Sequence, residues 1–91
     1  AKLSSLADGL RREGVEHLAI FGSRARGDAL PDSDLDVLID VAPGQGFSLL
    51  NLCGVALLIE DAAGIRTEVV LRRSLPRYLA DRIADDLVPV L

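Results

Sequence analysis

The sequence predicts a small α/β (α+β) domain in which helices pack against a mixed β-sheet. Stretches with apolar residues three or four positions apart indicate helices, and shorter runs with alternating or continuous apolar residues indicate strands. Apolar residues make up 49% of the chain and aromatic residues only 3%, so the core must be aliphatic, and a disordered chain is excluded. The length of 91 residues accommodates one domain, 1–91, and is too short for a second lobe.

The first half of the chain predicts two helical segments and two strands. Leucines recur at helical spacing before Gly14, and apolar residues alternate with acidic ones after a turn at 31–33. The predicted elements are a helix over about 3–13, a buried strand over 17–21, one helical turn over 23–27 and a second strand over 35–39.

The second half predicts two longer helices around a third strand. A break at 43–46 precedes a helix over about 47–62, which ends at Gly64, and the third strand covers 67–71. Pro76 begins the last helix, because proline is tolerated in a first turn. The apolar stripe of this helix is Leu79, Ile83 and Leu87, and its water-facing residues are Asp81, Arg82, Asp85 and Asp86.

The connections between the strands predict the topology of the sheet. The first two strands are joined through a tight turn without a long helix, which favours an antiparallel pair. The second and third strands are joined by a long helix, the usual connection of a parallel pair. The end of the first strand and the starts of the other two then lie at one edge of the sheet, which brings Gly22, Ser23, Asp34, Asp36 and Glu68 together.

Two carboxylates near the start of the second strand indicate a metal site. Asp34 and Asp36 are two residues apart, so on a strand they point to one face, about 7 Å apart along the backbone. Their mutual repulsion is relieved by a hard divalent cation, which phosphoryl and nucleotidyl transfer require. The alternative is that they are only the polar end of a turn and an edge strand.

A glycine and a serine at the end of the first strand indicate a phosphate site. Gly22 permits close approach of the backbone, and Ser23 offers a hydroxyl and an N–H group at the start of a helical turn. Arg24 and Arg26 flank this point and could contact the phosphates of a nucleotide through charge-assisted hydrogen bonds. Either arginine could instead face solvent.

These residues together resemble a known family. Gly-Ser at 22–23, ten intervening residues and Asp-Leu-Asp at 34–36 match the pattern of the minimal nucleotidyltransferase (MNT) family of the DNA polymerase β superfamily. The resemblance covers essentially the whole chain and implies the minimal nucleotidyltransferase fold. It also implies a third carboxylate near the start of the third core strand, typically aspartate, and here the matching residue is Glu68. An ion pair of Glu68 with Arg66 or Arg72 is the structural alternative.

The resemblance implies a metal-dependent enzyme with a protein partner. Asp34, Asp36 and Glu68 are expected to hold Mg²⁺, two ions in all, and ATP is the expected substrate. MNT proteins frequently accompany a helical HEPN partner as toxin–antitoxin pairs, so we expect transfer of AMP to a tyrosine of a HEPN toxin. Two alternatives stay open: a non-catalytic antitoxin that inhibits its partner by contact, and a small-molecule nucleotidyltransferase that acts as a dimer.

The predicted helix over 47–59 is apolar almost all round. A helix that covers a sheet buries one face, so this pattern predicts a surface for a HEPN-type partner or for a second copy of the chain. The apolar tail at 88–91 points the same way, although terminal helices could cover the helix instead. Cys53, the only cysteine, is expected to pack as a small hydrophobic residue.

Charge and hydropathy exclude other classes of protein. The net charge of −4 argues against direct nucleic-acid binding, which normally uses a basic face. The N-terminal residues lack the apolar stretch of a signal peptide, and the longest apolar run is shorter than the ~20 residues that cross a bilayer. We therefore expect a cytoplasmic protein that does not contact membranes.

Overall fold

A four-stranded mixed sheet forms the centre of the structure, a computed structural model that describes residues 2–43 and 46–91. Its strands are β1 (Val15–Phe21), β2 (Leu35–Val41), β3 (Thr67–Leu71) and β4 (Val88–Pro89), and their order across the sheet is β3-β2-β1-β4. β1 pairs antiparallel with β2, and β2 pairs parallel with β3. Both predicted pairings are confirmed, and the predicted fold class with them. Part of the predicted break at 43–46, namely 44–45, lies outside the described residues.

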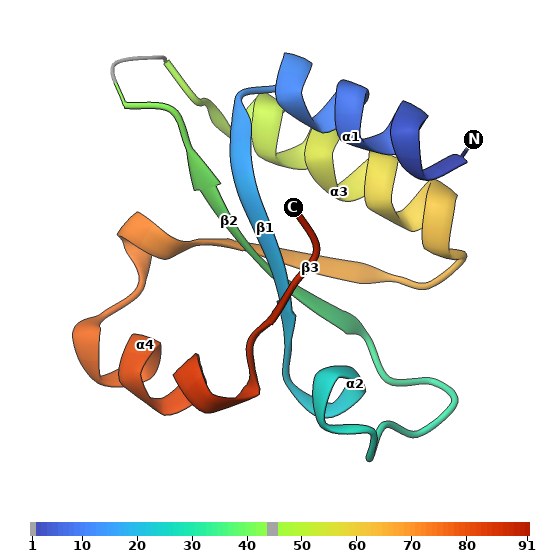
Figure 1. The fold of residues 1–91 in the computed structure, drawn as a ribbon, viewed down its shortest axis with the longest axis vertical. Helices are drawn as coiled ribbons and strands as arrows, with labels where there is room; N and C mark the ends of the chain where they lie inside the picture. The colour runs from blue at the N-terminus through green and yellow to red at the C-terminus, as the bar shows by residue number, and fades with distance from the viewer. Residues whose placement is uncertain (1, 44–45) are drawn as a thin grey trace.

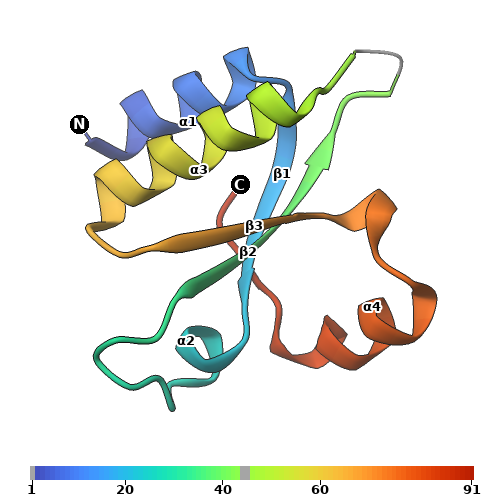
Figure 2. The same cartoon turned by 180° about the vertical axis from the view of Figure 1, so that it is seen from behind.

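Two helices lie side by side on one face of this sheet, and two others lie near its lower end in Figures 1 and 2. They are α1 (Lys2–Arg12), α2 (Ser23–Arg26), α3 (Leu49–Ala63) and α4 (Arg77–Ile83), with single 3₁₀ turns η1 (Arg72–Ser74) and η2 (Ala84–Asp86). Both views place α1 beside α3 on the same face, whereas α2 and α4 lie away from them. The last helix is shorter than predicted, because η2 replaces its final turn and leaves Leu87 outside it.

A capping box sets the start of α3 at Leu49 rather than at 47. The Ser48 hydroxyl accepts a hydrogen bond from the Asn51 N–H, and the Asn51 side chain accepts one from the Ser48 N–H at 3.0 Å. The Asn51 amide also donates to Glu13 next to α1 at 3.0 Å, which ties the two neighbouring helices together. The helix ends as predicted at Gly64, which adopts the left-handed conformation.

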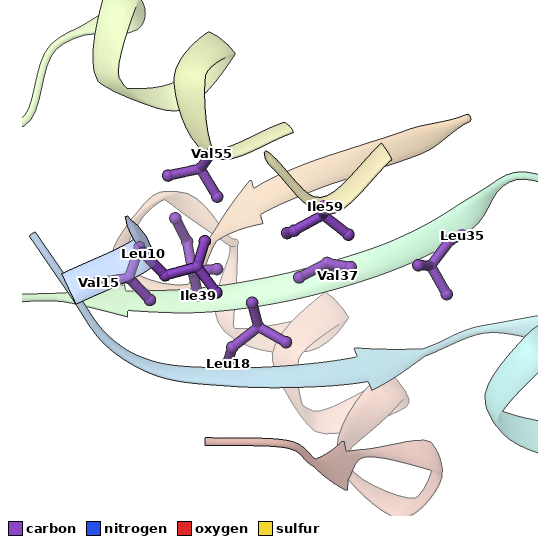
Figure 3. Close-up of a cluster of buried hydrophobic side chains, with 8 residues drawn as sticks. All are labelled: Leu10, Val15, Leu18, Leu35, Val37, Ile39, Val55 and Ile59. Atoms are coloured by element: carbon purple, nitrogen blue, oxygen red, sulfur yellow. The ribbon is translucent and has the colours of Figure 1, made fainter. Parts of the chain in front are cut away.

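The core lies between the sheet and the pair α1 and α3 (Figure 3). Alternate residues of β2 point into it, because successive side chains of a strand face opposite sides. Each of its members is at most 8% exposed, so substitutions that remove volume here lower stability. The core cluster consists of Leu10, Val15, Leu18, Leu35, Val37, Ile39, Val55 and Ile59.

The C-terminal tail is part of the sheet, which the sequence analysis did not predict. Val88 pairs with Ile20 and Pro89 with Ala19, both antiparallel, and the Val90 N–H donates to the carbonyl of Leu18 at 2.8 Å. This pairing covers the edge of β1, an edge that would otherwise expose unpaired backbone groups. The tail is therefore a structural element, although Val88 and Val90 remain 46% and 44% exposed.

One side of α3 is apolar and open to solvent. Leu49, Leu50 and Leu57 are 75%, 84% and 66% exposed, and Cys53 is exposed between them. We call these four residues the α3 stripe. The predicted open apolar side of this helix is confirmed, whereas the prediction that Cys53 is packed is wrong. Among the described residues, no helix has both the length and the apolar character that a membrane span requires.

Candidate functional site

The predicted acidic residues lie at one edge of the sheet, where β2 and β3 begin. Asp36 is in register with Glu68 on its parallel side and with Phe21, the last residue of β1, on its antiparallel side. Strands in register lie about 4.8 Å apart, and paired side chains share a face. Asp34 precedes β2 and has the same parity as Asp36. The structure therefore brings the three carboxylates to one place, next to Gly22.

These carboxylates lie on the side of the sheet opposite the core. The residues of β2 that alternate with Asp36, such as Val37, point towards α1 and α3. The second face of β2 carries Asp36, Leu38 and Asp40, and only Leu38 of these is fully buried. Asp36 is half-buried, and Asp34 and Glu68 are exposed. The acidic edge is therefore accessible to a ligand, and α1 and α3 do not cover it.

Gly22 lies directly against the carboxylate of Asp36. A β-carbon at position 22 would lie 3.3 Å from Asp36 Cγ and inside van der Waals contact with Oδ2. The backbone of Gly22 has φ +79° and ψ −157°, which is a conformation that only glycine adopts readily. Both facts require a glycine at the corner between β1 and α2. Ser23 follows as the first residue of α2, at the position that the sequence predicted for a phosphate contact.

The site carries negative charge, and among residues 2–43 and 46–91 none of its three carboxylates forms an ion pair. Burial raises the pKa of Asp36 above its usual value of 3.8, and the charges of Glu68 and Asp34 raise it further, whereas Arg26 lowers it. The charges of Glu68 and Asp34 oppose the ionisation of Asp36, and such an environment favours a cation.

The carboxylate oxygens and the negative charge of the site suit Mg²⁺, although the three side chains are not arranged around one point. All three side chains offer hard carboxylate oxygens, the ligands that Mg²⁺ prefers. Among residues 2–43 and 46–91, no group of three or more Asp, Glu, His or Cys side chains is arranged to hold a metal ion. To share an ion with Asp36, the exposed side chains of Asp34 and Glu68 would have to move towards it.

The alternative role of Glu68 as half of an ion pair is not observed. Within the described part of the chain, Arg72 pairs with Asp40 at 2.8 Å, and Glu68 forms no ion pair. This contact gives Asp40 a structural role at the far end of the same strand face. It also leaves the Glu68 carboxylate available at the acidic edge.

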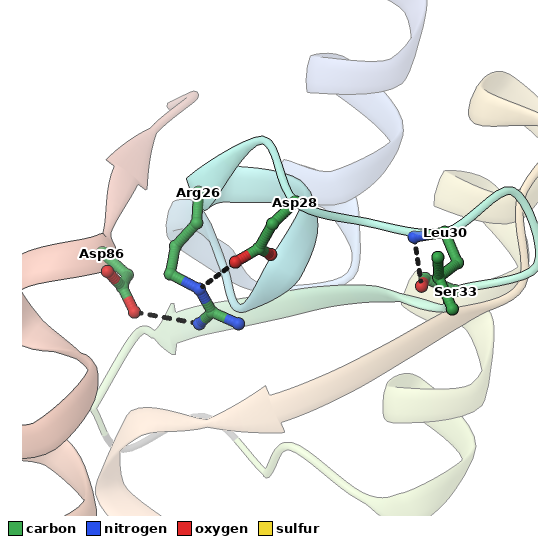
Figure 4. A network of polar contacts seen from close by, with 5 residues as sticks. All are labelled: Arg26, Asp28, Leu30, Ser33 and Asp86. Atoms are coloured by element: carbon green, nitrogen blue, oxygen red, sulfur yellow. Dashed lines mark hydrogen bonds and ion pairs between the residues drawn. The ribbon is translucent and has the colours of Figure 1, made fainter.

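The two predicted phosphate-binding arginines make different contacts. Arg26 forms ion pairs with Asp28 and with Asp86 of η2, both at 3.2 Å, as Figure 4 shows. These carboxylates raise the pKa of the Arg26 guanidinium, so it stays charged. Asp86, predicted to face water, is partly exposed and pairs with Arg26. Arg24 donates to the backbone carbonyls of Ser33 and Pro31 instead.

A polar hollow of about 430 Å³ lies beside Asp34. The loop 31–34 and the segment 64–66 line it, so it opens at the same edge as the carboxylates. Arg66 is exposed in this hollow and lies directly before β3, and its backbone carbonyl accepts from the Leu35 N–H at 2.8 Å. From the sequence, Arg66 is predicted only as a possible partner of Glu68. Its place before a strand parallel to β2 was the signal that it neighbours Asp34.

Comparison with known proteins identifies the class to which this fold and acidic edge belong. Residues 3–90 match the family model described as "Nucleotidyltransferase domain". The chain is 34% identical over 79 residues to protein adenylyltransferase MntA of Thermococcus cleftensis, covering 87% of this chain and 78% of that protein. A protein of Methanocaldococcus jannaschii, provisionally named a protein adenylyltransferase, is 37% identical over 82 residues, covering 90% and 86%.

Solved structures agree with this match. The chain superposes with a TM-score of 0.79 and 31% identity on a structure provisionally described as a minimal nucleotidyltransferase, covering 97% of this chain and 88% of that one. An MNT antitoxin complex with tri-AMPylated Shewanella oneidensis HEPN toxin shares the fold, with a TM-score of 0.65, 16% identity and coverage of 97% and 67%. The chain therefore belongs to the nucleotidyltransferase domain family and has the minimal nucleotidyltransferase fold. The prediction of a nucleotidyltransferase enzyme is confirmed at this level.

Proposed function

We propose that this chain transfers AMP from Mg-ATP to a hydroxyl group of a partner protein. The observation that carries the proposal is the register of Asp36 with Glu68 and with the end of β1, beside Gly22 and Ser23. In this arrangement the carboxylate oxygens would serve as ligands of a cation next to a corner suited to phosphate. The names of the relatives, protein adenylyltransferases, support the same reaction.

The reaction exchanges a phosphoanhydride bond of ATP for a phosphoester bond to the acceptor. The acceptor oxygen attacks the α-phosphorus of ATP, the bond from this phosphorus to the bridging oxygen breaks, and pyrophosphate leaves. Bound Mg²⁺ supplies charge neutralisation for the triphosphate and its leaving group. The Ser23 hydroxyl would donate a hydrogen bond to a phosphate oxygen, Asp34 and Asp36 would hold the cation, and Glu68 would hold the second cation or accept the proton of the attacking hydroxyl. The cytoplasm supplies both ATP and Mg²⁺, and we place the reaction there.

The proposed acceptor is a tyrosine of a HEPN-type toxin, and the chain would act as its antitoxin. Support for this target comes from the MNT antitoxin complex with AMPylated HEPN toxin. Asp34 and Glu68 are exposed at the acidic edge, so a side chain from another protein could reach the site. Inhibition by contact alone is the second candidate, because the α3 stripe offers an apolar surface without any chemistry.

The test uses ATP labelled on the α-phosphate, Mg²⁺ and the protein encoded beside this one. We expect label on that protein with the wild type and loss of label with Asp36→Asn. Asp8→Asn, an equal change on exposed α1, should keep full transfer. Tight binding without label would favour inhibition by contact. Label on no protein, together with turnover of a small alcohol or amine, would favour a small-molecule nucleotidyltransferase.

We also propose that the α3 stripe is a contact between two copies of the chain. The stripe and the carboxylates lie on opposite sides of the sheet, so an acceptor docked on α3 would not present its hydroxyl to the same copy. Leu57→Asp should convert a dimer to a monomer in light scattering and keep the circular dichroism spectrum of the folded chain, since Leu57 is 66% exposed. A wild-type monomer that loses partner binding upon this substitution would assign the stripe to the partner instead.

A further inference from the structure

The guanidinium group of Arg24 is already engaged by the protein backbone. Its Nε and Nη2 donate to the carbonyl of Ser33 at 3.0 and 2.7 Å, and Nη2 also lies 3.4 Å from the carbonyl of Pro31. The two bonds to Ser33 are partly buried, and they tie α2 to the loop before β2. These bonds occupy the Nε and Nη2 edge of the guanidinium, and a phosphate that approached this edge would have to displace them, so the geometry argues for a different role.

The carbonyl of Ser33 controls the position of Asp34. The peptide group between these residues is planar, so a fixed carbonyl oxygen also fixes the α-carbon of Asp34. On the other side, the Leu35 N–H donates to the carbonyl of Arg66 at 2.8 Å. The backbone of Asp34 is therefore held on both sides, by the carbonyl of Arg66 directly before β3 and by the side chain of Arg24 in α2.

We call the two hydrogen bonds from Arg24 to the Ser33 carbonyl the Arg24 clamp. The loop between Arg24 and Asp34 depends on this clamp for its shape. Within it, the Ser33 N–H donates to the carbonyl of Leu30 at 3.0 Å, and the Leu30 N–H donates to the Ser33 hydroxyl at 2.9 Å (Figure 4). These two bonds close a turn but do not attach it to the rest of the protein. Among the side chains of the described residues, Arg24 makes the hydrogen bonds that attach the Ser33 carbonyl to α2.

We propose that Arg24 is a positioning residue that holds Asp34 in place for nucleotidyl transfer, and not a ligand of the triphosphate. This inference rests on the function proposed above. The planar guanidinium donates from two nitrogen atoms to one oxygen, which the single ammonium of lysine does not reproduce. Because α2 also carries Ser23, the clamp keeps the phosphate end of the site and the carboxylate end at a fixed separation.

The kinetic test compares Arg24→Ala and Arg24→Lys with Arg11→Ala, an exposed arginine on α1. A displacement of Asp34 by ~1 Å costs on the order of 100-fold in rate. We therefore expect kcat to fall by about 10- to 100-fold in both Arg24 variants, with the KM for ATP within about threefold of wild type. The Arg11 variant should match the wild type. A raised KM with rescue by lysine would instead identify a phosphate ligand and overturn the proposal.

Amide hydrogen exchange gives a readout that does not depend on activity. Amides in peptides covering 29–35 should exchange about tenfold faster in both Arg24 variants, because the loop loses its attachment, and should be unchanged in Arg11→Ala. Unchanged exchange in the Arg24 variants would overturn the inference whatever their activity. If the wild type transfers no nucleotide, the proposed function fails, and the exchange result still decides whether Arg24 clamps the loop.

Discussion

Replacing Gly22 by alanine should separate the chemistry of the site from the stability of the fold. The new methyl group would lie inside van der Waals contact with Asp36 Oδ2 and 3.3 Å from its Cγ. Non-bonded carbon atoms prefer a separation of about 3.5–4.0 Å, so the carboxylate has to move. The position also has a positive φ of +79°, which penalises any side chain.

The expected loss of transfer rate follows from the contacts of the new methyl group with Oδ2 and Cγ of Asp36. A carboxylate oxygen pushed out to normal contact moves on the order of 1 Å, and such a displacement of a reacting group costs roughly 100-fold in rate. The backbone conformation adds about 1–3 kcal/mol of destabilisation. For a domain of this size, each kcal/mol lowers the melting temperature by about 4–8 °C, so the variant remains folded at moderate temperature if the protein has ordinary stability.

The assay measures the initial rate of AMP transfer at a temperature where every variant is folded, as judged by circular dichroism. Gly27→Ala is the matched control, because Gly27 also has a positive φ of +82° but a β-carbon there would meet nothing within 4 Å. The control should lose about 1 kcal/mol of stability and keep its transfer rate within a fewfold of wild type. Equal loss of rate in both variants, or full activity in Gly22→Ala, would refute the reasoning.

Three further changes test the site and the core. Burial and the neighbouring charges raise the pKa of Asp36 above 3.8, so the folded protein binds this proton more tightly than the unfolded chain. The free energy of unfolding of the metal-free protein should therefore fall as pH rises from the unfolded-state pKa of Asp36 to its folded-state pKa. Asp36→Asn should be more stable than wild type at neutral pH but not below both pKa values. Urea titrations at several pH values measure this difference. Glu68→Gln should lower the transfer rate and raise the Mg²⁺ concentration needed for half-maximal rate, whereas an unchanged Mg²⁺ response would remove Glu68 from the metal site. Ile59→Ala, 5% exposed, should lose about 2–5 kcal/mol in chemical denaturation, and Leu57→Ala, 66% exposed on the same helix, should lose much less.

The sequence predicted the acidic edge well because its cause is local and periodic. The two-residue spacing of Asp34 and Asp36 fixes their shared face, and a helix between two strands predicts their parallel pairing. These facts predict that the starts of β2 and β3 meet, and the observed register of Asp36 with Glu68 agrees with this prediction. Their roles in metal binding and catalysis stay predictions.

The contacts that the sequence did not predict join residues far apart in the chain. Arg26 pairs with Asp86 across 60 positions, and β4 pairs with the far edge of β1. No local pattern indicates such a pairing, since a two-residue strand is too short to show a period. The exposure of Cys53 was predicted wrongly because α3 is apolar almost all round, so its sequence does not show which side faces water.

The position of the α3 stripe opposite the acidic edge affects how an assembly could work. If two copies join through α3, their reaction centres face outwards in different directions, and neither is blocked by the junction. Such a pair is bivalent, and a partner that carries several acceptor hydroxyls could be held by one centre while the other reacts. The second encounter would then occur at the effective concentration set by the assembly, which reaches the millimolar range for short, flexible tethers. Successive modification of one target would be faster than independent collisions allow.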